Sequence, residues 1–118
     1  MSLNLDKYHT FATRLEQLRL DIAANLLNVQ EIREHLTLLE QFFLTQIVPL
    51  NNDQSIEHTE QMYITEMSKQ LRLLEIDIMF LGGARQAATM EARVKTICDR
   101  LTTISGYCEK IRGVGSGE

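Results

Sequence analysis

One apolar pattern runs from Tyr8 to Phe43 without a glycine or proline to interrupt it. Its members recur at spacings of three and four residues, with the polar Asn25 as one member: Tyr8, Phe11, Leu15, Leu18, Ile22, Asn25, Val29, Ile32, Leu36, Leu39 and Phe43. This spacing is typical of a helix that buries one face against other helices. A second pattern of the same kind closes the chain: Ala87, Met90, Val94, Ile97, Leu101, Ile104, Cys108 and Ile111. The two patterns predict an all-α helical bundle.

The boundaries of the helices follow from the breakers between them. Pro49 disfavours the helical conformation at the residue before it, so the first helix is expected to end near Ile47. A second helix is expected over about residues 54–81, and Gly82 and Gly83 then allow the chain to reverse. These signals predict three long antiparallel helices.

The third helix is expected over about residues 84–112, and the glycine-rich residues 113–118 read as a flexible tail. We therefore expect a single bundle domain over residues 1–112, because a chain of 118 residues is long enough for one modest core.

The length of the first helix leaves two arrangements open. Unbroken, it would span about 64 Å, roughly 20 Å more than either later helix. Either a second copy of the chain covers this overhang, or the first segment breaks near Asn25–Asn28 and folds back to give four helices. Asn28 and Glu31 resemble a capping box, which supports the break. The spacing of the apolar residues continues unchanged across Asn25–Asn28, and no glycine or proline is present there, which favours the unbroken helix.

Composition and charge limit the functional classes. Apolar residues make up 44% of the chain and charged residues 24%, as in ordinary soluble domains. No apolar run is long enough to span a bilayer, and the first residues do not resemble a signal peptide, so we expect a cytoplasmic protein. Cys98 and Cys108 lie about 15 Å apart on one helix, too far for a disulfide, and are expected to be buried reduced thiols.

The net charge of −4 is unevenly distributed. Residues 1–81 carry six basic and twelve acidic side chains, whereas residues 84–112 carry six basic and three acidic ones. An acidic domain makes a nucleic-acid partner improbable, because neutralising phosphates needs a basic surface. The basic third segment is suited to an acidic protein.

No catalytic motif is present in the sequence. There is no nucleophile elbow, phosphate-binding glycine loop or Cys-x-x-Cys pair, so we expect no enzymatic activity and no cofactor. Glu31 and His35, four residues apart, form at most half of a metal site, and an ordinary ion pair is the favoured reading. A small helical enzyme or metal binder built on these two residues is the least favoured hypothesis.

Two surfaces are candidates for binding. Arg85, Arg93 and Arg100 follow one stripe of the third helix with intervening threonines, and arginine pairs well with carboxylates. We predict that these three arginines contact a partner; the alternative is a solvated outer face. The second candidate is an apolar excess on the second helix, either buried at a crowded end of the bundle or used in a dimer or partner contact: Leu73, Ile76, Met79 and Phe80.

The opening residues 1–18, Met-Ser-Leu-Asn-Leu-Asp-Lys-Tyr-His-Thr-Phe-Ala-Thr-Arg-Leu-Glu-Gln-Leu, and the layout that follows resemble a known family. A long amphipathic first segment, the Pro-Leu-Asn-Asn turn at residues 49–52 and two further helices are similar to the PatD family of cyanobacterial heterocyst-frequency control proteins. The resemblance covers most of the chain but supplies no short motif, so it assigns no site residues. It implies a non-enzymatic regulator that limits heterocyst frequency and binds the cell-division protein FtsZ. The alternative is a generic helical dimerisation or adaptor module with another protein partner.

Overall fold

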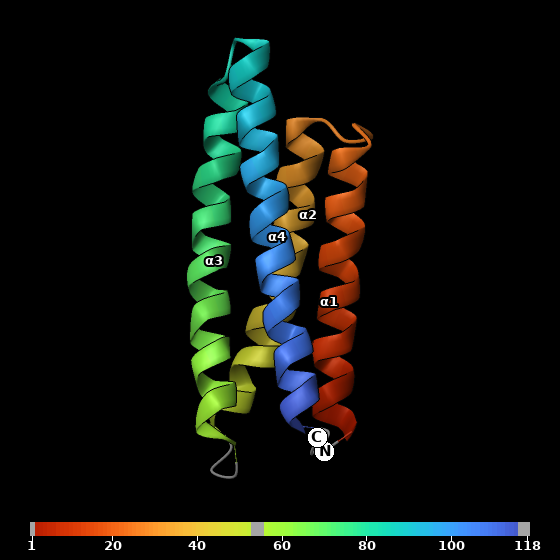
Figure 1. Ribbon diagram of the computed structural model, residues 1–118, viewed down its shortest axis with the longest axis vertical. Helices are drawn as coiled ribbons and strands as arrows, with labels where there is room; N and C mark the ends of the chain where they lie inside the picture. Colours follow the sequence, from red (N-terminus) through yellow and green to blue (C-terminus); the bar gives the residue numbers. More distant parts are fainter. Residues whose placement is uncertain (1, 53–55, 116–118) are drawn as a thin grey trace.

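The protein is an up-down-up-down bundle of four helices (Figure 1). The computed structural model describes residues 2–52 and 56–115. Four α-helices form the bundle: α1 (Ser2–Ala23), α2 (Val29–Phe42), α3 (His58–Gly83) and α4 (Ala87–Gly115). The described residues contain no strand, which confirms the predicted all-α class.

The first segment is broken, so the preference for one unbroken helix was wrong. α1 ends at Ala23 in a Schellman motif: the Leu26 amide donates to the Asp21 carbonyl (3.0 Å) and the Asn25 amide to the Ile22 carbonyl (3.0 Å). Asn25 takes the left-handed conformation, with φ of 59°, which usually requires glycine. Asparagine tolerates this conformation better than other side chains, so the chain turns without a glycine.

α2 begins with the capping box that the sequence suggested. The Asn28 side-chain oxygen accepts from the Glu31 amide (2.8 Å), and the Glu31 carboxylate accepts from the Asn28 amide (2.9 Å). Because α1 and α2 are now antiparallel neighbours, the expected overhang of a long first helix does not exist. A dimer that covers such an overhang is therefore excluded.

The end of the first segment is less abrupt than predicted. α2 gives way to a π-helical turn at Phe43–Ile47 and a 3₁₀ turn at Val48–Asn52 that includes Pro49. α4 likewise continues to Gly115, past the predicted end at residue 112, while residues 116–118 of the predicted tail lie outside the described residues.

The core lies between the four helices and contains nearly all of the first apolar pattern. Ten of the largest apolar side chains in it are completely buried or almost so: Tyr8, Phe11, Leu15, Ile47, Ile64, Met67, Leu74, Ile97, Leu101 and Ile104. α4 packs most extensively against α1 and α3. The Tyr8 hydroxyl donates to Glu60 Oε2 at 2.5 Å, which ties α1 to α3. No helix of the described chain is long and apolar enough to cross a membrane.

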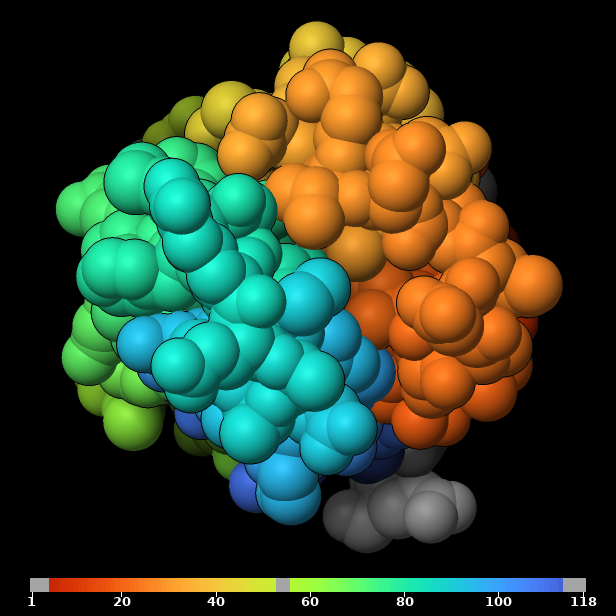
Figure 2. All heavy atoms as spheres, turned by 90° about the horizontal axis from the view of Figure 1, so that it is seen from above, coloured from red at the N-terminus to blue at the C-terminus, as the bar shows by residue number. Residues whose placement is uncertain are grey.

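The hairpin of α3 and α4 projects beyond the connection between α1 and α2 (Figure 1). Figure 2 looks onto this end, with the hairpin tip in teal and cyan beside the orange α1–α2 connection. The projection explains one departure from the predicted core: Ala87 and Met90, the first members of the second apolar pattern, are exposed. In these first turns of α4 the two residues are not covered by α1 and α2, whereas Ile97 and the later members of the second apolar pattern are buried.

Candidate interaction surfaces

The three predicted contact arginines have different surroundings. Arg100 bonds through its guanidinium to the buried Asp77 on α3, and its Nη1 donates to Gln70 Oε1 at 3.1 Å. Its charge is therefore used to join α3 to α4. Removing Arg100 would leave a buried carboxylate without its cation, so loss of binding in an Arg100 variant would not by itself identify a contact.

Arg93 and Arg85 lie at the projecting end of the hairpin. The Arg93 guanidinium carbon stacks over the Phe80 ring, 4.7 Å from its centroid, which is cation–π geometry. Arg85 is exposed in the connection between α3 and α4, and within the described chain it has no ion-pair partner. Arg85 and Arg93 thus belong to the connection and the first turns of α4, whereas Arg100 lies further along α4 in a structural ion pair.

The apolar excess on α3 is at the surface rather than buried. The exposed fractions are 36% for Leu73, 41% for Ile76, 65% for Met79 and 51% for Phe80. Of the two readings of these residues, burial at a crowded end is wrong, because each of the four side chains is at least 36% exposed. Exposed apolar side chains grouped in this way are typical of an interaction site.

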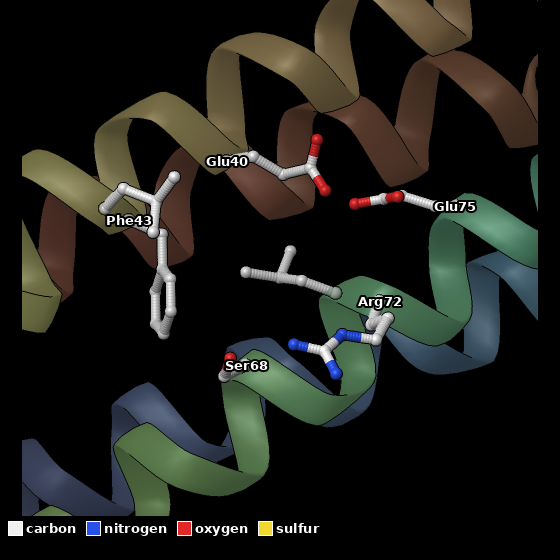
Figure 3. Close-up of a pocket in the computed structure, with 7 residues that line it drawn as sticks. Glu40, Phe43, Ser68, Arg72 and Glu75 are labelled. Carbon is white, nitrogen blue, oxygen red and sulfur yellow. The ribbon is translucent and has the colours of Figure 1, made fainter.

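Glu40 on α2 and Glu75 on α3 form a carboxyl pair that sequence reasoning missed. Their side chains point toward one another across the junction of the two helices (Figure 3). Partial burial, followed by the hydrogen bond and charge of Glu75, raises the pKa of Glu40 to about 7. No cation of the described residues forms a salt bridge with either carboxyl group. Only the antiparallel packing of α2 on α3 brings these residues together, so no local signal in the sequence could reveal them.

The favoured prediction for Glu31 and His35, an ordinary ion pair, was wrong, and the two residues do not form part of a metal site among the described residues either. Glu31 is used in the capping box of α2, and no salt bridge joins it to His35. Among the described residues, no group of three or more histidine, cysteine or acidic side chains is placed to hold a metal ion. Cys98 and Cys108 are free thiols, and burial raises the pKa of Cys108 to about 12.

Comparison of the chain with protein-family models, with curated proteins and with solved structures gives no match.

Proposed function

We propose that this chain is a non-enzymatic protein-binding regulator whose partner is FtsZ, as the resemblance to the PatD family implies. In this proposal it acts in the cytoplasm, where FtsZ assembles, and limits heterocyst frequency. The observation that supports a binding role is the end of the α3–α4 hairpin, where the exposed Phe80 carries Arg93 stacked on its ring and Arg85 is exposed in the connection between the two helices.

This end has the composition of a protein contact. Aromatic and arginine side chains contribute most of the binding energy in many interfaces, and Phe80 with Arg93 stacked on it supplies both. Arg85 adds a second cation at the same end of the bundle. Apolar side chains flanked by cations fit an acidic segment of a partner that also has apolar side chains.

Co-sedimentation with FtsZ polymers tests the proposal. The double variant Arg85→Glu with Arg93→Glu is expected to lose co-sedimentation, because two attractive charges become repulsive, while its far-UV circular dichroism stays unchanged. The matched control is Arg112→Glu, a reversal on the same helix near the opposite end of the bundle. Arg100→Glu is measured separately, because it breaks the ion pair with Asp77.

Two results would count against the proposal. Double-variant protein that pellets with FtsZ as efficiently as the wild type would remove the hairpin end from the interface. Wild-type protein that stays in the supernatant would favour the alternative, a helical adaptor with a different protein partner.

A further inference from the structure

The junction of α2 and α3 forms a continuous surface with two adjoining grooves, which we call the α2–α3 face. One groove, of about 250 Å³, lies toward Leu44 and Ser68 and includes Arg72. The other, of about 340 Å³, lies toward Met79 and includes Arg33. Glu40 and Glu75 line both grooves, so the carboxyl pair lies at the centre of the face.

The charges on this face lack partners within the described chain. Neither carboxyl group forms a salt bridge with a cation, and neither Arg72 nor Arg33 forms one with an acidic group. Figure 3 shows the Arg72 guanidinium beside Ser68, apart from the two facing carboxyl groups. The face therefore presents a cation and an acidic pair side by side, each available to a second molecule.

These charges are arranged so that the face is complementary to itself. Arg72 and Glu75 lie one turn apart along α3, on the side that lines the first groove. A two-fold axis between them would run the two α3 helices antiparallel and bring Arg72 of each copy to the carboxyl pair of the other. The same axis would bring exposed Leu44 of one copy toward exposed Met79 of the other, since these residues lie on opposite sides of the acidic pair.

We propose that the protein forms a symmetric dimer through the α2–α3 face, in which Arg72 of each copy pairs with Glu40 and Glu75 of the other. The molecule measures 49 × 23 × 18 Å. Even the smaller of its two long faces, bounded by the 49 Å and 18 Å extents, has room for the approximately 800 Å² per partner that a standard interface buries. Leu44 and Met79 supply apolar area, because each lines one of the two grooves and is exposed in the single chain. The proposed dimer does not depend on whether FtsZ is the partner that binds the end of the α3–α4 hairpin.

The dimer should respond to pH in a defined direction. In the single chain the pKa of Glu40 is raised to about 7 by burial and by Glu75, and the other charged groups that line its two grooves are Arg72 and Arg33. An added guanidinium favours the ionised carboxylate, so dimer formation releases a proton from the acidic pair. The dimer dissociation constant should therefore fall as the pH rises from about 6 to about 8.

Charge reversal and rescue give a decisive test by sedimentation equilibrium. The wild type is expected to dimerise at micromolar concentration, and Arg72→Glu or Glu75→Arg alone to weaken the dimer by about tenfold or more, because each creates two like-charge contacts. The two changes in one chain restore both attractive contacts, and an equimolar mixture of the two single variants does so in a mixed dimer. Circular dichroism of each variant verifies that the bundle is intact.

The possible outcomes separate this inference from the proposed function. Arg85→Glu with Arg93→Glu, the variant of the hairpin end, should dimerise like the wild type. Wild-type protein that is monomeric at about 100 μM, far above the micromolar constants of weak specific pairs, would overturn the dimer. Single reversals that dimerise normally, or a double reversal that is not restored, would overturn this arrangement of the two copies.

Discussion

The turn between α1 and α2 provides the sharpest test of how this sequence selects four helices. Asn25 is left-handed, with φ of 59°, and closes the Schellman motif of α1, while the Asn28 side chain caps α2. Alanine at residue 25 keeps a Cβ in a conformation that is unfavourable for it and should cost about 1 kcal/mol. Alanine at residue 28 removes the capping bond and should cost about 1 kcal/mol more.

The free energy of unfolding of the double variant Asn25→Ala with Asn28→Ala should therefore be about 2 kcal/mol lower than that of the wild type. For a chain of 118 residues this corresponds to a fall in Tm of about 8 °C. Urea titration followed by far-UV circular dichroism measures the free energy of unfolding, and thermal scans measure Tm. The matched controls are Asn25→Gly, which keeps the left-handed conformation accessible, and Asn28→Ser, which keeps a capping oxygen.

The comparison at residue 25 decides whether this reasoning is right. Asn25→Gly should equal or exceed the wild type in stability, and Asn25→Ala should be lower than both. If alanine and glycine at this position give the same free energy of unfolding, backbone conformation does not hold the turn. The fold-back would then have to come from packing of α2 against α1 and α3.

Three further predictions concern single contacts in the bundle. A Glu40→Gln variant should lose one pH-dependent term: because the pKa of Glu40 is raised in the folded protein, the contribution of this group to the free energy of unfolding is greatest below about pH 4.5 and falls toward pH 7. The variant should therefore lose less stability than the wild type over this range, measured by urea titration at low protein concentration. Gly106→Ala should raise Tm through a gain of about 0.5–1 kcal/mol, because a Cβ at this helical position meets no atom within 4 Å; a lower Tm would show a close helix approach there. Arg100→Ala should destabilise the protein by about 3 kcal/mol, since it leaves Asp77 buried without a cation, and Arg100→Met combined with Asp77→Leu should recover most of that loss in the same assay.

The bundle could be predicted from the sequence because the spacing of apolar residues is a local property of each helix. Leu15, Leu36 and Leu101 belong to the predicted patterns, and all three are buried in the core. The break in the first segment was harder to predict because its apolar phase continues on both sides of the turn. The local signals at Asn25 and Asn28 were readable, but their energies are small beside the burial of whole helical faces, so sequence alone did not decide between the two arrangements.

The candidate surfaces could be predicted only in part, for a related reason. The exposure of a side chain depends on how far the neighbouring helices extend. The α3–α4 hairpin projects because α1 and α2 end before it does. On α3, Met79 and Phe80 remain exposed, whereas their neighbours Ile78 and Leu81 are buried in the core. The carboxyl pair of Glu40 and Glu75 also depends on tertiary structure, since its members are far apart along the chain and meet only when α2 lies antiparallel to α3.

The role of Arg100 could have been predicted from the partner helix. The end of α3 is apolar on nearly every side, and Asp77 is an acidic residue within that stretch, beside the buried Leu74 and Ile78. A carboxylate in such a position requires a cation from another element, because burying it alone would cost several kcal/mol. Among the arginines of the predicted stripe, the one on the buried part of α4 is Arg100, while Arg85 and Arg93 lie near the projecting end. The stripe therefore has two functions along its length: Arg100 holds α4 to α3, and this attachment positions the hairpin that presents Arg93 and Arg85 to solvent.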